Sequence, residues 1–304
     1  MPVPATNVPG APPRSGISAA FTMTPLPALV GAVWRFAGRS LKARHWFYLQ
    51  LYLLFVLIRM AGVPLGEWLA AGVEALPLKD MARMVPMMVL MPLFFILLYR
   101  AVLLERWQGK RGFAALIRGQ PYALFFLVWL CLNLTTEIVV LPFRVAGSLL
   151  SPLSGILYAL PAVDFDMYLS MLLTEAVQGI GWIIFTTIGI GVPALGVGGL
   201  AALNRLLPDY PTVMRTTLWL SAIFILPVQL LYATEQFAYN FVMNAQGVWW
   251  MEQDLLFRFT FLPNGLWALQ HFIVDPLRYM ALASLAPIIH AIAWPAPDGT
   301  ANPE

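Results

Sequence analysis

The sequence predicts an all-α, polytopic integral membrane protein, a helical bundle of about six transmembrane helices with a cytoplasmic N-terminal amphipathic helix. The 304 residues are 60% hydrophobic and 11% charged, with a mean hydropathy of +0.75. Soluble domains are about 45–50% apolar and about 25% charged, so a shift of this size indicates that lipid is the solvent. Six apolar runs approach or exceed the roughly 20 residues that a helix needs to cross a bilayer. Lysine and arginine gather on one side of these runs, as in multi-span proteins.

Both ends of the sequence are predicted to be disordered, over residues 1–24 and 295–304. The first segment, "MPVPATNVPGAPPRSGISAAFTMT", is rich in Pro, Ala, Gly and Ser, and the second has a similar composition. The first segment has no basic stretch followed by an apolar core, so it does not have the pattern of a signal peptide. Met23 is an alternative start to Met1. Residues 25–294 are predicted to form a single transmembrane domain.

Residues 25–44, "PLPALVGAVWRFAGRSLKAR", predict an amphipathic helix. Its apolar positions recur at helical spacing: Leu26, Val30, Val33, Ala37 and Leu41. Its basic residues are Arg35, Arg39, Lys42 and Arg44, and the first three share another face. A basic amphipathic helix of this kind is typical of a helix that lies on the cytoplasmic membrane surface, where it binds anionic lipid headgroups. The alternative is a cytoplasmic extension of the first span.

The six predicted spans cover about 46–63, 84–104, 122–141, 176–203, 216–234 and 266–294. The first is short, and the last is broken by Pro276 and Pro287. The fourth is over-long and contains the glycine-rich run "GIGVPALGVGG". Ala194, Gly198 and Ala202 place a small residue at every fourth position there, a pattern that lets helices pack closely in lipid. A hinge or the thin wall of a cavity is the alternative.

The distribution of charge predicts the orientation of the bundle. Basic residues precede the first span, and they also lie between spans two and three and between spans four and five. The opposite side is richer in acidic residues. The positive-inside rule then places the N- and C-termini in the cytoplasm, in agreement with the even number of spans. We expect a bacterial inner membrane, with the lipid bilayer itself as the main partner and further membrane proteins as candidates.

Motifs for catalysis or cofactor binding are missing from the sequence. It contains neither a phosphate-binding loop nor a His-Glu-x-x-His zinc helix, and Gly-x-Ser-x-Gly is also absent. We therefore expect no cofactor, no metal, no catalytic residue and no nucleic-acid partner. The missing motifs also argue against an enzyme. The single cysteine, Cys131, excludes an intramolecular disulfide. We expect it to be buried as a small apolar residue.

Charged and polar residues recur in the outer half of the predicted spans. Glu137 lies 19 residues after Arg118, about 28 Å along a helix. The candidate intramembrane polar cluster comprises Arg59, Arg83, Asn133, Glu137, Glu175, Gln178, Glu235, His271, Asp275 and Arg278. Charges at this depth are costly unless they pair or face water, and the signs in this set balance. We expect Arg59 and Glu137 to belong to one buried network, which either joins helices or lines an outward-facing cavity; long side chains that reach the headgroups are the alternative.

The sequence is compatible with two main functions, and an enzyme is a third alternative. The first is a non-enzymatic scaffold, assembly factor or subunit of a membrane complex. The second is a transporter or lipid-handling protein that uses the polar site in the outer half of the bundle. The third would use Glu137, Glu175, His271 and Asp275 for acid–base chemistry, but no motif supports it.

A basic amphipathic helix ("VWRFAGRSLKARHWF") that leads into a six-span bundle resembles the bacterial families related to the membrane domain of glycerophosphodiester phosphodiesterase. The resemblance is one of architecture, over about residues 25–290. It implies a lipid-related function and assigns no site residue.

Overall fold

The computed structural model describes residue 21 and residues 24–73, 76–103, 122–157, 165–245 and 268–294. In these ranges the chain forms the helices α2 (Leu26–Ala71), α3 (Leu76–Leu103), α5 (Tyr122–Leu157), α6 (Phe165–Ile188), α7 (Val192–Leu206), α8 (Tyr210–Ala245) and α11 (Asp275–Ala293). Six of the described helices are long and apolar enough to cross a membrane. The predicted all-α membrane bundle is confirmed. Apart from residues 21 and 24, the two segments predicted to be disordered lie outside the described ranges.

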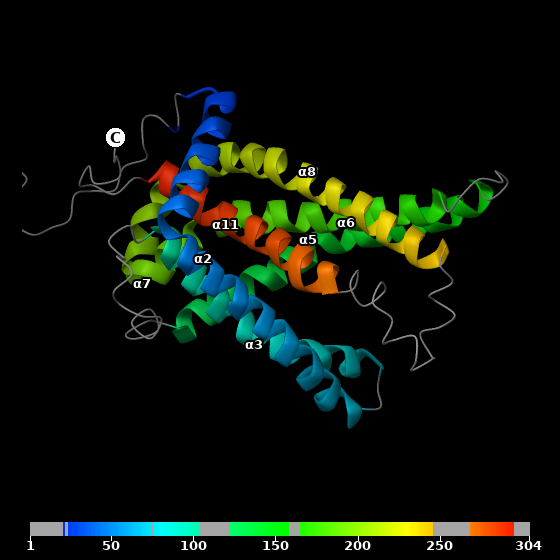
Figure 1. Ribbon diagram of the computed structural model, residues 1–304. Coiled ribbons are helices and arrows are strands. Elements are labelled where there is room, and N and C mark those ends of the chain that lie inside the picture. The colour runs from blue at the N-terminus through cyan, green and yellow to red at the C-terminus, as the bar shows by residue number, and fades with distance from the viewer. Residues whose placement is uncertain are drawn as a thin grey trace, which may run out of the picture.

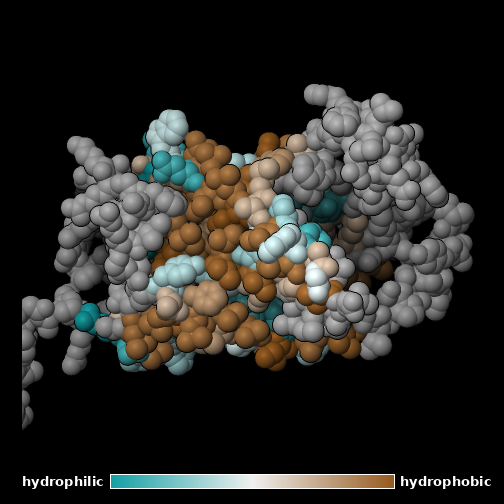
Figure 2. Space-filling view, turned by 90° about the horizontal axis from the view of Figure 1, so that it is seen from below, coloured by the Kyte–Doolittle hydropathy of each residue, from teal (hydrophilic) through white to brown (hydrophobic). Residues whose placement is uncertain are grey.

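The bundle contains two helix pairs, a central helix α11, and α5, which packs against α6 (Figure 1). α6 and α8 run antiparallel, since Tyr168 stacks on Phe237 near one end and the Tyr210 hydroxyl bonds to Ile188 O near the other. α2 pairs with α3, and α11 packs against α2, α3, α6 and α8. Side chains of α2, α6 and α8 can therefore contact side chains of α11. The described outer surface is largely apolar on the face in Figure 2, as expected of helices that contact lipid.

α2 joins the predicted surface helix and the predicted first span into one 46-residue helix. It kinks at Arg44 (φ −135°, ψ 29°), which is the predicted boundary between the two. The Arg44 side chain donates to the carbonyl of Ala101 in α3, and Ser40 and Tyr48 share a 2.7 Å hydrogen bond across the kink. The helix continues past Val63 and through Pro64 to Ala71, beyond the predicted span.

The segment before the kink has both buried and exposed positions, and Leu41 of its predicted apolar face is exposed. Leu29 and Val33 are buried against the bundle, whereas Arg35, Arg39 and Lys42 are exposed. Trp34 is exposed as well, and its ring lies 5.6 Å from that of Phe224 in α8. This segment therefore packs along α8; its position on a membrane surface stays a prediction.

The other helices also extend beyond the predicted spans. α3 begins at Leu76, α5 ends at Leu157, and α8 covers Tyr210–Ala245. Hydropathy measures only the part of a helix that lipid must cover, whereas the backbone hydrogen bonds continue into the more polar flanks. The apolar portions, such as Val85–Leu103 and Tyr122–Phe143, lie close to the predicted ranges.

The predicted fourth span is not one helix, because a 3₁₀ turn at Gly189–Gly191 divides α6 from α7. Packing leaves little room for a side chain at this turn. A Cβ at Gly189 would lie 2.7 Å from Leu132, and one at Gly191 would lie 2.8 Å from the Tyr210 ring. The Tyr210 hydroxyl donates to Ile188 O (2.5 Å) and accepts from the Gly191 amide (3.0 Å). The glycine-rich run therefore lets the chain bend while neighbouring side chains satisfy its backbone.

Buried His290 of α11 supports the same turn. Its Nδ1 lies 2.9 Å from the carbonyl oxygen of Ile190, and its ring stacks on Trp294. In the small-residue row of α7, Ala194 is buried and Ala202 is half-buried, while the surroundings of Gly198 lie outside the description. α7 packs on α3 and α5.

The predicted break in the last span is a π-helical turn, Gln270–Val274, directly before α11. Pro276 has no N–H, so the carbonyl four residues earlier, that of Phe272, loses its usual helical donor. The Tyr52 hydroxyl of α2 donates to this carbonyl. A side chain of α2 thus bonds to the backbone of the wider π turn.

The expectation that Cys131 is buried is wrong. It lies on the exposed side of α5, beside Leu127, Leu134 and Ile138. An apolar residue within a span can face lipid as readily as protein, so hydrophobicity alone does not predict burial there.

Candidate intramembrane site

Asp275, at the start of α11, binds side chains from two other helices. Its Oδ2 accepts from Arg59 Nη1 of α2 at 2.9 Å. Its Oδ1 accepts from the Tyr232 hydroxyl of α8 at 2.6 Å and from Gln270 Nε2 of the π turn at 3.0 Å. The Asp275 side chain is only 15% exposed, so these donors replace the water that a carboxylate otherwise needs.

Arg278, one turn further along α11, binds α6. Its Nη1 lies 3.2 Å from Glu175 Oε2, and its Nη2 lies 3.3 Å from Gln178 Oε1. Its guanidinium carbon sits 3.3 Å from the centre of the Tyr232 ring, a cation–π contact. Tyr232 thus bonds to Asp275 through its hydroxyl and to Arg278 through its ring face.

These seven residues form one polar network that joins four helices; we call Arg59, Glu175, Gln178, Tyr232, Gln270, Asp275 and Arg278 the four-helix network. Its geometry follows from helical spacing. Asp275 and Arg278 are three residues apart on α11, as are Glu175 and Gln178 on α6, so each pair lies on one helix face. Two arginines and two carboxylates of the network form ion pairs, and each pair links α11 to a different helix.

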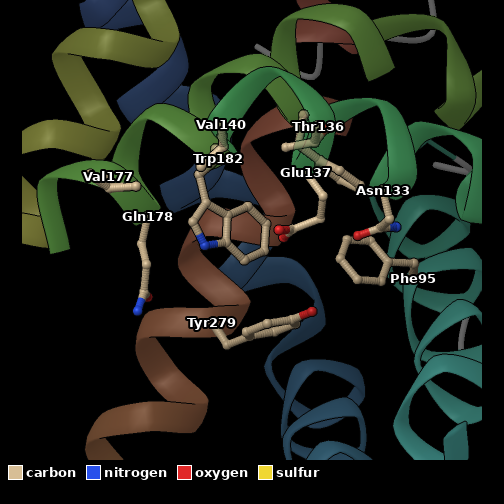
Figure 3. Close-up of a pocket in the computed structure, with 11 residues that line it drawn as sticks. Phe95, Asn133, Thr136, Glu137, Val140, Val177, Gln178, Trp182 and Tyr279 are labelled. Atoms are coloured by element: carbon tan, nitrogen blue, oxygen red, sulfur yellow. The ribbon is translucent and has the colours of Figure 1, made fainter. Parts of the chain in front are cut away.

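A cavity of about 240 Å³ lies next to the network, between α5 and α6 (Figure 3). α3 and α11 contribute Phe95 and Tyr279 to its wall. The lining residues are Phe95, Asn133, Thr136, Glu137, Val140, Val177, Gln178, Gly181, Trp182, Phe185 and Tyr279. The Glu137 carboxylate points into the space between Trp182 and Phe95, above Tyr279. Gln178 belongs both to this cavity and to the four-helix network.

The polar side chains of α5 near the cavity bond to their own helix. Asn133 Nδ2 donates to Trp129 O at 2.8 Å, Thr135 to Cys131 O at 2.8 Å, and Thr136 to Leu132 O at 2.9 Å. Such i→i−4 bonds satisfy hydroxyl and amide hydrogens without a second helix. The polar run around Glu137 is therefore compatible with a position within a span.

Four aromatic rings form the opposite wall, which we call the aromatic wall: Phe95, Trp182, Phe185 and Tyr279. Trp182 meets Tyr279 edge-on at 5.2 Å, and Phe95 meets Tyr279 at 6.0 Å. Phe185 contacts both Phe95 (5.7 Å) and Trp182 (5.8 Å). Rings that pack on one another in this way have few alternative rotamers, so the wall is preorganised.

Most of the polar residues predicted from the sequence fall into these two groups. Arg59, Glu175, Gln178, Asp275 and Arg278 belong to the four-helix network, and Asn133 and Glu137 line the cavity. Arg59 pairs with Asp275, whereas Glu137 lies in the cavity.

The remaining predicted residues lie at the edge of the network or outside the description. Glu235 accepts from Gln236 at 3.2 Å and lies within electrostatic range of Asp275 and Arg278. The side chains of Arg83 and His271 lie outside the described part of the structure. Among the residues that the structure describes, no three of the types His, Cys, Asp and Glu gather as metal ligands would.

Sequence reasoning missed Tyr232, Gln270, Trp182 and Tyr279. Tyr232 and Gln270 are each five residues or fewer from a predicted acidic residue, which is a weak signal. Aromatic residues are common in membrane spans, so nothing in the pattern distinguishes Trp182 and Tyr279 from packing residues.

Comparisons with protein families, with characterised proteins and with solved structures found no match to this chain. The resemblance in architecture to the glycerophosphodiester phosphodiesterase membrane domain stays a prediction.

Proposed function

We propose that the protein is a non-enzymatic membrane protein that binds and handles a lipid or a small amphiphilic solute. The observation that carries this proposal is the Glu137 carboxylate, which lines a cavity in the membrane-spanning part of the bundle. An ionisable residue at such a depth is costly and typically marks a path or a site for a polar ligand. A concave site with a few polar groups among apolar and aromatic side chains suits an amphiphile.

The four-helix network supports this role by fixing the cavity wall. Arg278 holds Gln178, a lining residue, through a 3.3 Å hydrogen bond, and it pairs with Glu175 on the same helix face. Asp275 connects the same part of α11 to α2 through Arg59. A binding site on rigid, cross-linked helices keeps its lining residues in place without a ligand.

A cavity-filling variant tests the proposal. Gly181 lines the cavity, and a Cβ there would meet only Val140 at 3.4 Å and Thr136 at 3.8 Å, so Gly181→Leu places its side chain in the cavity without a backbone clash. The matched control is Gly38→Leu, because a Cβ at exposed Gly38 meets nothing within 4 Å. Native mass spectrometry of protein extracted with its membrane lipids is the measurement.

We expect the wild type and Gly38→Leu to retain a bound small molecule or lipid that Gly181→Leu lacks. Equal retention by all three proteins would remove the cavity as the site. Stoichiometric co-purification of another membrane protein that shields Glu137 from labelling would favour the second candidate, a scaffold, assembly factor or subunit of a complex.

We also infer that the end of the bundle with the basic residues faces the cytoplasm, in a bacterial inner membrane. Exposed Arg35, Arg39 and Lys42 support this orientation, as do exposed Arg205 in the last turn of α7 and exposed Arg215 near the start of α8. Cys131 is the single cysteine, so a Cys131→Ser background permits site-specific labelling. With a membrane-impermeant maleimide on intact cells, Glu67→Cys should react and Arg39→Cys should react only after lysis; the reverse pattern would invert the orientation.

A further inference from the structure

We propose that the cavity between α5 and α6 binds a vicinal diol, carried by a small polyol or by a lipid headgroup. The α5 side provides hydrogen-bond acceptors, the α6 side provides donors, and the aromatic wall provides apolar surface. This inference rests on the proposed function, and it specifies the chemical class of the ligand.

Two acceptors of α5 line the cavity. Asn133 uses an Nδ2 hydrogen for Trp129 O at 2.8 Å, and its Oδ1 lies on the side of the amide toward Glu137 (Figure 3). The Thr136 hydroxyl uses its only hydrogen for Leu132 O at 2.9 Å, so its oxygen is left as an acceptor. Asn133 and Thr136 are three residues apart, and the two side chains therefore share one face of α5.

Two donors of α6 line the same cavity. Gln178 Oε1 accepts from Arg278 Nη2 at 3.3 Å, which leaves the Nε2 hydrogens of Gln178 as donors. The Trp182 Nε1–H has no hydrogen-bond partner among the described residues, and it lies on the side of the indole toward Gln178 (Figure 3). Gln178 and Trp182 are four residues apart, so they share one face of α6. Tyr279 of α11 adds a hydroxyl, which can donate or accept.

Acceptors on one side of the cavity and donors on the other favour hydroxyl groups. A hydroxyl donates and accepts at once, so it can bridge an α5 acceptor and an α6 donor. An ammonium has no acceptor and would leave the α6 donors unpaired, whereas a sulfate ester has no donor and would leave the α5 acceptors unpaired. Because each side carries two such groups, two adjacent hydroxyls match them better than a single carboxamide does.

The charge of the cavity gives no reason to prefer an ion. Glu137 is the one charged side chain among the described lining residues, and it already interacts with another residue of the protein. We therefore assign the contacts with the diol to the neutral lining groups. A neutral ligand also avoids the cost of moving an ion out of water.

The size of the cavity limits what enters it. At about 240 Å³ it corresponds to several water molecules, each with a share of roughly 30 Å³ of liquid volume. A diol fits within this space, and its C–H groups can pack on the aromatic wall and so leave water. A complete lipid does not fit. The diol therefore enters from a free polyol or from a lipid whose chains stay outside.

The test measures binding of matched probes to the purified full-length protein, in an amine oxide detergent that has no hydroxyl group of its own. The probes share a hexyl chain and carry a terminal vicinal diol, the dimethyl ether of that diol, a carboxamide, an ammonium or a sulfate. Isothermal titration calorimetry compares their affinities. We expect the diol to bind about tenfold more tightly than its dimethyl ether, which keeps both oxygens but cannot donate to α5. The amide and both ions should bind more weakly than the diol.

Adjacent threonines of α5 give a matched pair of variants. Thr136→Val removes an acceptor from the cavity and should reduce the preference for the diol over the ether. Thr135 makes the same kind of bond, to Cys131 O at 2.8 Å, but it is exposed and does not line the cavity, so Thr135→Val should keep the full preference. Trp182→Phe removes a donor and should weaken the diol and the ether alike, since both have oxygens that accept. Gly181→Leu should abolish binding of every probe.

Native mass spectrometry with two anionic lipids distinguishes the sources of the diol. The headgroup of phosphatidylglycerol ends in a vicinal diol, whereas phosphatidic acid is anionic without it. Preferential retention of phosphatidylglycerol that is reduced in Thr136→Val and kept in Thr135→Val identifies a lipid headgroup. Binding of the diol probe without that lipid preference identifies a free polyol.

The outcomes separate this inference from the proposed function. Equal affinity for the diol and its ether, tighter binding of the amide or of either ion, or equal effects of Thr136→Val and Thr135→Val overturns the diol assignment while the cavity remains a site. Absence of probe binding has the same meaning when Gly181→Leu still loses a native ligand. Absence of probe binding together with equal retention of native ligands by wild type and Gly181→Leu overturns both proposals.

Discussion

The hydroxyl of Tyr52 in α2 donates to the backbone carbonyl of Phe272, the carbonyl that Pro276 leaves without its usual helical donor. The same two helices meet again about two turns further along α2, where Arg59 pairs with Asp275 at 2.9 Å. Tyr52 and Arg59 are seven residues apart and therefore lie on one face of α2. The irregular start of α11 is thus stabilised from α2 at two successive levels.

Removal of the Tyr52 hydroxyl should destabilise the bundle. We expect Tyr52→Phe to lower the free energy of unfolding by about 1–3 kcal/mol, since the Phe272 carbonyl would lose this hydrogen bond in a medium with little water. Chemical or thermal unfolding in detergent measures the loss. In a Pro276→Ala background, which restores a backbone N–H, the effect of Tyr52→Phe should shrink; an equal loss in both backgrounds would contradict the coupling.

The Arg59–Asp275 pair should show strong non-additivity. We expect Arg59→Met alone to lower stability by about 2–3 kcal/mol, because Asp275 is only 15% exposed and loses its cationic partner. The double variant Arg59→Met with Asp275→Leu should be less destabilised than the sum of the single variants. A double-mutant cycle from unfolding curves measures this coupling, and purely additive effects would show that the contact contributes little.

Buried Gln229 of α8 should tolerate an apolar substitution. Within the described part of the chain, neither of its amide atoms has a hydrogen-bond partner, and the residue has 0% exposure against Gly179. We expect Gln229→Leu to raise the melting temperature, because it removes buried polar atoms that lack partners. The matched control is Gln270→Leu, which should lower it, since Gln270 Nε2 bonds to Asp275 at 3.0 Å. A lower melting temperature for Gln229→Leu would indicate that the amide binds an internal water or ligand.

The turn between α6 and α7 should not accept a side chain at Gly191. A Cβ there would lie 2.8 Å from the Tyr210 ring and 2.9 Å from Leu203, and the Tyr210 ring is held by hydrogen bonds to Ile188 and Gly191. We expect Gly191→Ala to destabilise the protein by about 1–3 kcal/mol through overpacking. Gly38→Ala, in an open helical position, should be neutral or stabilising by about 0.5–1 kcal/mol. Equal melting temperatures for these two variants would contradict the packing argument.

The extent to which the site could be predicted differs between its two parts. Depth counting along the spans predicted that Arg59, Glu175, Asp275 and Arg278 lie in the outer half of the bundle, and the structure brings these four into ion pairs. It did not predict the pairing, because four helices can be rotated and ordered in many ways at the same depth. In the structure Arg59 pairs with Asp275, and Glu137 lines a cavity. No pattern in the sequence indicates the aromatic wall of that cavity.

The sequence by itself determined the class of molecule: an all-α bundle with six helices that are able to span a membrane. It could do so because the cost of exposing a polar backbone to lipid makes length and hydropathy sufficient evidence for a helix. Only the tertiary structure decided which charges pair, where the over-long fourth span turns, and which face of α5 borders a cavity. Those outcomes depend on how helix faces pack against one another, and in a chain that is apolar on nearly every face the sequence pattern does not specify the inward side.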